Sequence, residues 1–132
     1  MILDKKHALQ QKLFRQFAET EFTKELQDEL DLTGEFNWEM HKKMARYGFM
    51  GTKIPAEYGG AGGDSLSYVL MDEEFARQDL VLAIYANTSN SLGGGPLMLA
   101  GSKEQKDHGI RIDRAGCRLR CRWYHHHRNS GW

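Results

Sequence analysis

The sequence predicts an all-α fold, a helical bundle followed by an irregular C-terminal tail. Three observations support this prediction. Apolar residues recur three and four positions apart through most of the first hundred residues, which is the period of an amphipathic helix. The chain has only two prolines, as a helix-rich chain should. No segment up to Lys106 has the pattern of a strand.

The size and composition favour one soluble domain. A chain of 132 residues and 15.2 kDa is long enough for one core and too short for two well-buried ones. Hydrophobic residues make up 40%, charged residues 27%, and the mean hydropathy is −0.63, within the globular range. Charges at Asp4 to Lys6 precede any apolar leader, and no run approaches the ~18 apolar residues of a membrane span. We therefore expect a cytoplasmic protein that does not contact membranes.

The first helix is predicted to begin after a cap at Asp4. Its apolar residues form two adjacent rows at i,i+4 spacing, Leu9, Leu13 and Phe17 in one and Phe14, Ala18 and Phe22 in the other. Two outcomes are open beyond Phe22. The helix continues through Leu26 and Leu30, because neither glycine nor proline occurs before Gly34, or it frays or breaks among the polar residues there.

The second helix is predicted to follow a cap at Asn37 and to end at Gly48. Its inward residues would be Trp38, Met44 and Ala45, with either Met40 or His41. Residues 49–63 read as a connecting loop, since Ile54–Pro55 disfavours helix and residues 59–63 include four glycines.

The third helix would be capped by Asp64 or Ser65. Leu66, Val69, Leu70 and Phe75 would face the core, and Glu73 and Arg77 are spaced for an ion pair across one turn.

The fourth helix is predicted to run from a cap at Asp79 through Leu80 to Leu92. It is nearly apolar on all sides, which indicates burial between other elements. Residues 93–96, three glycines and a proline, should interrupt it before a short apolar segment at residues 97–100. Ser102 and Gln105 have the spacing of a capping box for one more helix.

The last 26 residues differ in kind from the rest. Residues 1–106 carry twelve basic and sixteen acidic residues, a net charge of −4, and only three of the basic residues are arginine. Residues 107–132 carry six arginines, no lysine and two acidic residues, a net charge of +4. We therefore divide the chain into a helical domain at residues 3–106 and an Arg-rich tail at residues 107–132.

The helical domain offers little independent chemistry. The glycine-rich loop lacks the G-x-x-x-x-G-K-[ST] spacing of a phosphate-binding loop. Asp72, Glu73 and Glu74 point about 100° apart around a helix, so we interpret them as a solvated face with Arg77 as partner. His7 and His41 have no Ser, Cys or carboxylate at motif spacing. No catalytic residue is expected.

The tail carries two alternative binding hypotheses. Cys117, Cys121 and His125, with His108, His126 and His127, have donor types that zinc prefers. Six arginines with Trp123, Tyr124 and Trp132 suit nucleic acid. On these grounds the chain would be a small helical binding module with a basic Cys/His tail for zinc or nucleic acid. An extension without an evolved role is favoured, so we expect neither a metal site nor nucleic-acid binding.

Four motifs in order resemble the N-terminal helical domain of the acyl-CoA dehydrogenases. They are Ile54-Pro55-Ala56-Glu57-Tyr58-Gly59-Gly60-Ala61-Gly62, then Glu73-Glu74-Phe75-Ala76-Arg77, then Asn90-Ser91-Leu92-Gly93 with Gly95-Pro96, and finally Gly101-Ser102-Lys103-Glu104-Gln105-Lys106. The likeness covers about residues 3–106. It departs from the family pattern at Phe22-Thr23-Lys24, where relatives often have a proline.

The resemblance implies part of an FAD-dependent oxidoreductase. In this family a helical N-terminal domain, a β-domain and a C-terminal bundle act together on acyl-CoA, with electron-transferring flavoprotein as partner, in α,β-dehydrogenation or in enoyl-CoA reduction. The N-terminal domain forms a wall of the acyl pocket. With the register set by Asn90 to Gly93, the matching wall residues are Ile84, Tyr85, Thr88 and Leu92. The alternative, ordinary interhelical core, is open for all four and is favoured for Tyr85.

The family's flavin-contacting and catalytic motifs have no counterpart in residues 107–132. We therefore expect the chain alone to bind no FAD and to be inactive. A frameshift or a mispredicted gene end after Lys106 is our hypothesis for the tail. The apolar fourth helix, without its β-domain neighbour, would favour self-association.

Overall fold

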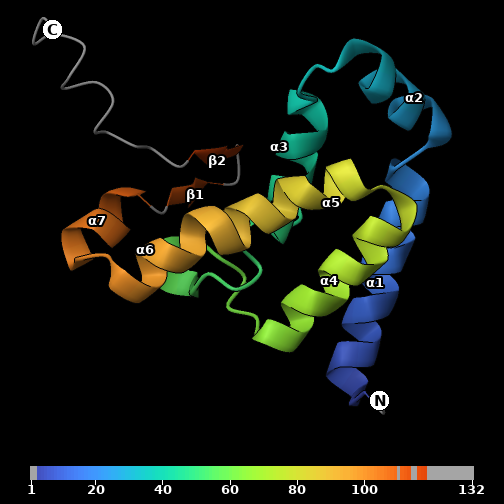
Figure 1. Ribbon diagram of the computed structural model, residues 1–132. Helices are drawn as coiled ribbons and strands as arrows, with labels where there is room; N and C mark the ends of the chain where they lie inside the picture. Colours follow the sequence, from blue (N-terminus) through green and yellow to red (C-terminus); the bar gives the residue numbers. More distant parts are fainter. Residues whose placement is uncertain (1–2, 110, 114–115, 119–132) are drawn as a thin grey trace, which may run out of the picture.

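The computed structural model describes residues 3–109, 111–113 and 116–118 and confirms the all-α fold (Figure 1). The helices are α1 (Lys5–Glu21), α2 (Lys24–Thr33), α3 (Trp38–Arg46), α4 (Ser65–Gln78), α5 (Leu80–Asn87), α6 (Gly94–Ala100) and α7 (Lys103–Gly109). Between them lie two 3-10 turns, η1 (Phe49–Gly51) and η2 (Ala56–Tyr58), and a π-helical turn, η3 (Thr88–Gly93).

The predicted helix caps are confirmed. The carboxylates of Asp4 and Asp64 accept hydrogen bonds from backbone N–H groups three residues later, both at 2.8 Å. Asn37 and Asp79 cap α3 and α5 in the same way. These side chains satisfy N–H groups that the first turn of a helix leaves without partners.

The first helix ends at Glu21, with Phe22 as its C-cap, and does not continue through Leu26 and Leu30. Of the two outcomes left open for this helix, the break is therefore the one observed. Phe22 is buried and packs against Phe75 with 5.2 Å between ring centroids. The hydroxyl of Thr23 then accepts from the N–H of Leu26 at 3.3 Å and caps a separate helix, α2. A polar cap directly after a buried ring therefore starts a new helix without glycine or proline.

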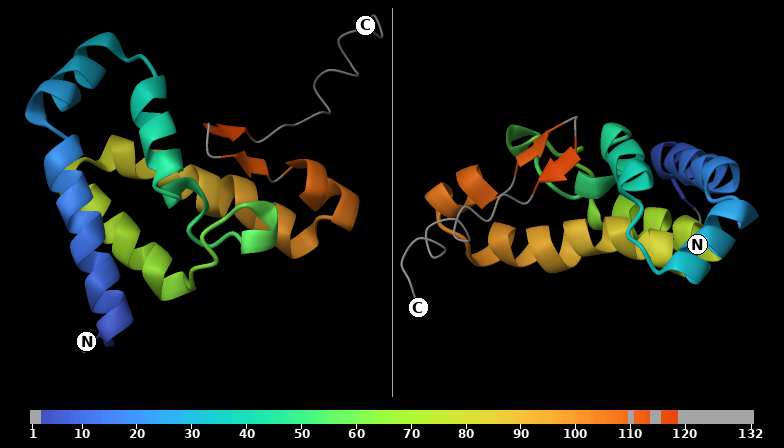
Figure 2. Two further views of the ribbon diagram at one scale, coloured as in Figure 1. Left: turned by 180° about the vertical axis from the view of Figure 1, so that it is seen from behind. Right: turned by 90° about the horizontal axis from the view of Figure 1, so that it is seen from above.

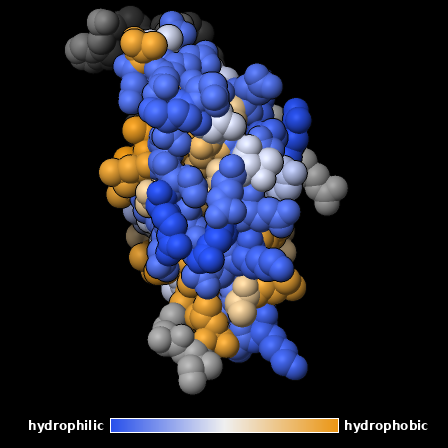
Figure 3. Space-filling model, turned by 90° about the vertical axis from the view of Figure 1, so that its right-hand side faces the viewer, coloured by the Kyte–Doolittle hydropathy of each residue, from blue (hydrophilic) through white to orange (hydrophobic). Residues whose placement is uncertain are grey.

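The core lies between α1, α4 and the η1 turn, and α1 lies beside α4 over most of its length. Its centre is an edge-to-face group of aromatic rings, with centroid distances of 4.8 Å for Phe17–Phe49 and 5.2 Å for Phe49–Phe75. Such pairs are more stable than their buried area alone implies. Figure 3 views the molecule from its α1 side, where hydrophilic side chains dominate and hydrophobic ones gather at the margins.

Several residues of the predicted apolar faces are exposed, including Leu13 at 49%. Trp38 is 64% exposed, Val69 54% and Leu9 70%. The bundle covers each of these helices on one side only. Apolar residues next to the buried stripe of the helix therefore remain exposed to solvent. Trp38 instead packs against the neighbouring Phe36 at 4.7 Å.

α5, η3 and α6 form one continuous helical rod, so the interruption predicted at residues 93–96 is wrong (Figure 1). A glycine inside a helix costs only about 1 kcal/mol relative to alanine. Pro96 is the third residue of α6, which follows directly on the π-helical turn η3. The predicted capping box is confirmed, because Ser102 N–H donates to Gln105 Oε1 at 2.8 Å and Gln105 N–H to Ser102 Oγ at 3.2 Å.

Within the tail, the structure describes two short strands. Strands β1 (Arg111–Asp113) and β2 (Gly116–Arg118) pair antiparallel, with Ile112 opposite Cys117, and β2 lies beside α3. In the part of the chain that is described, no helix has the length and apolar character that crossing a bilayer would require.

Candidate functional site

Three of the four candidate wall residues share one outward face of the rod. Ile84, Thr88 and Leu92, here called the outer row, are all exposed, Ile84 by 50% and Leu92 by 72%. Leu80 continues the row at 64%, so the prediction that this segment is buried on all sides is wrong. In the right-hand view of Figure 2 the rod runs along the edge of the molecule, because α4 and η1 cover only its inner side.

Tyr85 is directed away from the outer row. Its ring stacks on Phe36 at 4.3 Å between centroids, and its hydroxyl accepts a hydrogen bond from the N–H of Asn37 at 3.1 Å. These contacts hold the segment between α2 and α3 against α5. The structure therefore brings Ile84, Thr88 and Leu92 together and places Tyr85 in an interhelical contact.

The inner face of the rod is fixed by a buried carboxamide. Asn90 has no exposed surface. Its Nδ2 donates to the carbonyl oxygens of Phe49 at 2.7 Å and Ala86 at 2.9 Å, and its Oδ1 accepts from the N–H of Lys53 at 3.1 Å. The carboxamide thus joins the π-helical turn to the η1 segment and leaves the opposite face outward.

The glycine-rich loop packs on the rod through Ile54, which is 2% exposed. A Cβ on Gly94 would lie 2.7 Å from Ile54 Cδ1, and a Cβ on Gly60 would lie 2.0 Å from the Ile54 carbonyl oxygen. Backbone atoms block both positions, because a Cβ on Gly94 would also lie 2.8 Å from the Ser89 carbonyl oxygen. The motifs around residues 54–62 and 90–96 therefore meet in space, a packing reason that the sequence alone did not show.

The backbone N–H groups of this loop are already used. Those of Gly60, Ala61, Gly62 and Gly63 donate to carbonyl oxygens of residues 51–55 at distances of 2.7 to 3.2 Å. A phosphate-binding loop needs such groups to point at the ligand. The described residues therefore do not fit the diphosphate of a dinucleotide such as FAD here, and the interpretation of the segment as a connecting loop agrees with this geometry.

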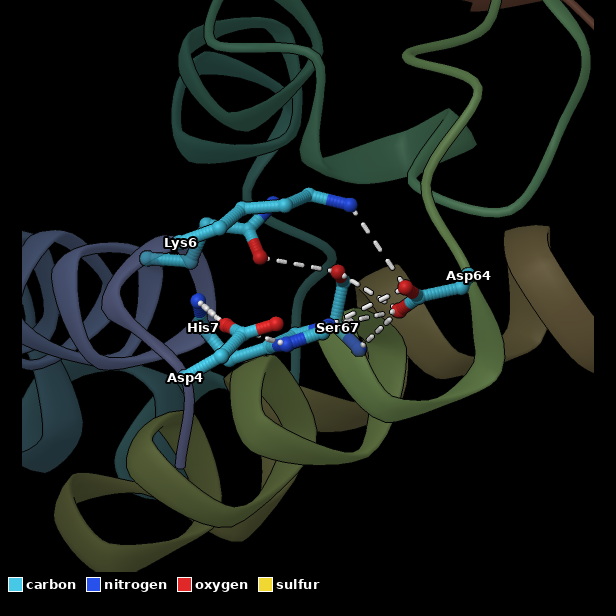
Figure 4. A network of polar contacts seen from close by, with 6 residues as sticks. Asp4, Lys6, His7, Asp64 and Ser67 are labelled. Atoms are coloured by element: carbon cyan, nitrogen blue, oxygen red, sulfur yellow. Dashed lines mark hydrogen bonds and ion pairs between the residues drawn. The ribbon is translucent and has the colours of Figure 1, made fainter. Parts of the chain in front are cut away.

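His7 has two carboxylate partners, although its sequence surroundings predicted none at motif spacing. Its Nδ1 lies 2.8 Å from Asp4 and its Nε2 3.0 Å from Asp64 (Figure 4). The backbone N–H and hydroxyl of Ser67, and then His7, hold the pKa of the Asp64 carboxyl well below its usual range. The Ser67 hydroxyl is hydrogen-bonded to Asp64 at 2.8 Å and to Gln10 at 2.9 Å, and not to His7. The His7 network therefore joins the N-termini of α1 and α4 and does not have the arrangement of a nucleophile hydrogen-bonded to its base.

Glu74 also differs from its prediction as part of a solvated face. Its side chain is fully buried and accepts hydrogen bonds from Arg15 Nε at 2.9 Å, Arg15 Nη2 at 2.8 Å and Gln11 Nε2 at 2.8 Å. These donors hold its pKa below the ordinary value. The predicted ion pair between Glu73 and Arg77 is confirmed, with 3.7 Å between Glu73 Oε1 and Arg77 Nη2.

No group of three or more His, Cys, Asp or Glu side chains that could hold a metal occurs among the residues whose side chains are described. The candidate zinc ligands Cys121 and His125 to His127 lie outside the described residues, as do the aromatic residues Trp123, Tyr124 and Trp132 of the nucleic-acid hypothesis.

The chain matches a family model described as acyl-CoA dehydrogenase, N-terminal domain, over residues 4–111. It is 49% identical over 105 residues to the caffeyl-CoA reductase-Etf complex subunit CarC of Acetobacterium woodii and 48% identical over 107 residues to a 3-(aryl)acrylate reductase of Clostridium sporogenes. An acyl-CoA dehydrogenase of Bacillus subtilis is 32% identical over 106 residues. These matches cover 80–81% of this chain and 28% of each relative.

A solved structure described as an electron transferring flavoprotein of Acidaminococcus fermentans contains a chain of the same fold. It matches with a TM-score of 0.77 and 30% identity over 87% of this chain and 30% of its own length. The chain thus spans less than a third of the length of the proteins that it resembles.

Proposed function

The chain belongs to the acyl-CoA dehydrogenase family, as its N-terminal domain, and from this premise we propose that the outer row forms part of the wall of an acyl pocket. The observation that carries the proposal is the pairing of an apolar, exposed face with a locked opposite face. Ile84 and Leu92 project outward, while Asn90 is fixed inside. A wall needs both properties, because apolar contact supplies binding and a fixed backbone supplies shape.

The chemistry of the rod suits an uncharged group. Residues 80–100 contain no Asp, Glu, Lys, Arg or His. Apolar surface gains about 25 cal/mol per Å² when it is removed from water, whereas a charged group placed there would lose its hydration without a partner. The row therefore favours the hydrocarbon part of a thioester over its phosphate-bearing CoA part.

We further propose that the substrates are 3-arylacrylic thioesters and that their double bond is reduced. Support comes from the 49% and 48% identity to proteins named caffeyl-CoA reductase subunit and 3-(aryl)acrylate reductase, against 32–38% for three bacterial relatives named acyl-CoA dehydrogenases. The name of the first relative as subunit of an Etf complex supports an electron-transferring flavoprotein as partner. FAD would be held by parts of the flavoprotein beyond these helices, and the 132 residues alone would neither bind FAD nor turn over.

A chimeric enzyme tests this function. In the caffeyl-CoA reductase subunit of A. woodii, the N-terminal region that matches this chain is replaced by residues 1–106. We expect the purified chimera to retain FAD, seen as flavin absorbance, and to reduce caffeyl-CoA. Leu92→Trp should raise KM roughly ten-fold, the equivalent of about 1.4 kcal/mol of lost binding, because the larger ring enters the space of the aryl group.

Leu9→Trp is the matched control, since Leu9 is a comparably exposed leucine, at 70%, on a different helix. It should leave KM unchanged. If the chimera holds FAD and the two tryptophan variants have equal KM values, the outer row is not a pocket wall. Flavin absorbance in the isolated 132-residue chain would contradict the proposal that these residues bind no FAD.

A further inference from the structure

The π-helical turn η3 occupies the part of the rod that carries two of the three outer-row residues. The Gly94 N–H shows the wider hydrogen bonding of this turn, because it donates to the carbonyl oxygen of Ser89, five residues earlier, as well as to that of Ser91. Single π-turns inside α-helices are rare and need a cause. Apolar periodicity over residues 80–92 predicted an uninterrupted α-helix and contains no signal of this turn.

Two consecutive side chains supply that cause by bonding back to the preceding turn. Asn90 Nδ2 donates to the carbonyl oxygen of Ala86 at 2.9 Å, and Ser91 Oγ donates to that of Asn87 at 2.9 Å. Each is a bond from residue i to the carbonyl of residue i−4, which an α-helix reserves for the backbone N–H. Side chains that take these carbonyls compete with the α-helical ladder and distort it.

Asn90 differs from Ser91 because its carboxamide also holds the turn from outside the helix. It is completely buried and bonds to both Phe49 and Lys53 of the adjacent segment. If the carboxamide moved away, the Phe49 carbonyl oxygen and the Lys53 N–H would lose this hydrogen-bond partner. Leaving buried polar groups without a partner costs free energy, so the side chain is held in this position. The turn is therefore anchored at one residue.

The turn changes where Leu92 points. In an α-helix each residue advances about 100°, so a step of four residues overshoots a full turn by about 40°. Two such steps would put Leu92 about 80° round the axis from Ile84. A π-turn needs more residues per revolution, so the step from Thr88 to Leu92 recovers most of this drift and returns Leu92 to the side of Ile84.

We propose that Asn90 is the positioning residue of the outer row, because its buried carboxamide fixes the π-turn that aligns Leu92 with Ile84 and Thr88. In the pocket-wall function, on which this inference rests, Asn90 would set the shape of the wall without touching the substrate. Its loss should therefore weaken substrate binding more than it slows the chemical step.

The first test uses the 132-residue chain and needs no activity. In Asn90→Leu, which keeps the branched skeleton of the side chain and removes its polar atoms, we expect the turn to revert to α-helix, seen as loss of the nuclear Overhauser contacts that span five residues between Ser89 and Gly94. Thr52→Val is the matched control: Thr52 is also buried and also donates to the Phe49 carbonyl, at 3.1 Å, but lies outside the rod. It should keep the π-turn.

A second measurement covers the case in which Asn90→Leu does not fold. In the unaltered chain, both Nδ2 protons of Asn90 should exchange with solvent at least about 100-fold more slowly than those of the exposed Gln16, as expected for groups released only by opening of the core. Rapid exchange, or a π-turn that persists in a folded Asn90→Leu chain, overturns the inference whatever the enzyme does.

The third test uses the holo chimera described above. Asn90→Leu should raise KM for the arylacrylyl thioester at least about five-fold with kcat changed less than about two-fold, the signature of lost binding shared by ground and transition states, whereas Thr52→Val should change neither. A turn that is lost in the chain together with an unchanged KM in the chimera would contradict the pocket wall itself. The two failures are thus distinguishable.

Discussion

Replacing Glu74 by glutamine tests the ion pair that joins α1 to α4. The two carboxylate oxygens of Glu74 accept three hydrogen bonds, two from Arg15 and one from Gln11, and the side chain has no exposed surface. Glutamine keeps the volume but loses the charge and turns an NH₂ group toward donors. The substitution therefore removes hydrogen bonds to a charged group without opening a cavity.

The size of the effect follows from how each partner is exposed. Removing one member of a buried ion pair costs about 3–5 kcal/mol when the other charge is left buried. Here the side chain of Arg15 is 44% exposed and regains water, so we expect a loss of about 2–3 kcal/mol in the free energy of unfolding, near the lower limit of that range. For a domain of about 100 residues this lowers Tm by roughly 10–20 °C.

The effect should depend on pH with a defined sign. Arg15 and Gln11 hold the pKa of Glu74 below its ordinary value of 4.5. A carboxyl whose pKa is lower in the folded state stabilises the fold above its unfolded pKa, and this stabilisation is lost as the pH falls through the folded pKa. The difference between wild type and Glu74→Gln should therefore be full at pH 7 and shrink below about pH 4.

Urea unfolding followed by circular dichroism measures both quantities. Glu73→Gln is the matched control, since Glu73 is the neighbouring residue, is 54% exposed and pairs with Arg77 at 3.7 Å. It should lose less than about 0.5 kcal/mol. Equal losses in the two variants, or a Glu74→Gln effect that does not change with pH, would refute this account of the α1–α4 contact.

Three further predictions follow from the packing and charge of single residues. Gly94→Ala should destabilise the chain by roughly 1–3 kcal/mol in urea unfolding, because its Cβ would lie 2.8 Å from the Ser89 carbonyl oxygen and 2.7 Å from Ile54 Cδ1. Gly95→Ala, with its nearest contact at 3.7 Å, should have a much smaller effect. Asp64→Asn keeps the cap but should make the free energy of unfolding fall less steeply as the pH is lowered, because the Asp64 carboxyl, whose pKa is lowered in the folded state, stabilises the fold only while it is ionised. The same fall in the free energy of unfolding at acid pH in variant and wild type would be inconsistent with this. Leu92→Ser should reduce self-association in sedimentation velocity, since Leu92 is 72% exposed on an uncharged rod, and a wild-type chain that is monomeric at high concentration would disprove the association.

Local signals in the sequence located most helix starts correctly. The predicted caps at Asp4, Asn37 and Asp79 depend on side chains that bond to N–H groups three residues away, and such bonds are set by the adjacent sequence alone. The break after Phe22 was less determined, because it depends on the burial of Phe22 against Phe75, which lies 53 residues later in the chain. Tertiary contact decided between two locally acceptable conformations.

The errors about apolar residues share one physical origin, which is that periodicity does not say how many sides of a helix are covered. Val69 and Leu80 are apolar and at helical spacing, yet each lies on an uncovered side. The buried charge of Glu74 was missed because its partner, Arg15, is 59 residues away in the sequence. The outer row was found only through family resemblance, since composition alone predicted a buried helix there.

A crystal structure of the chimeric enzyme with a bound arylacrylyl-CoA analogue tests the central claim most directly. We predict that the side chains of Ile84, Thr88 and Leu92 lie within about 4.5 Å of the aryl-acrylyl group, the range of direct apolar contact, with the Asn90 carboxamide buried behind them. An analogue bound elsewhere, with the outer row facing solvent or another protein surface, would contradict the claim that these helices form a wall of the acyl pocket.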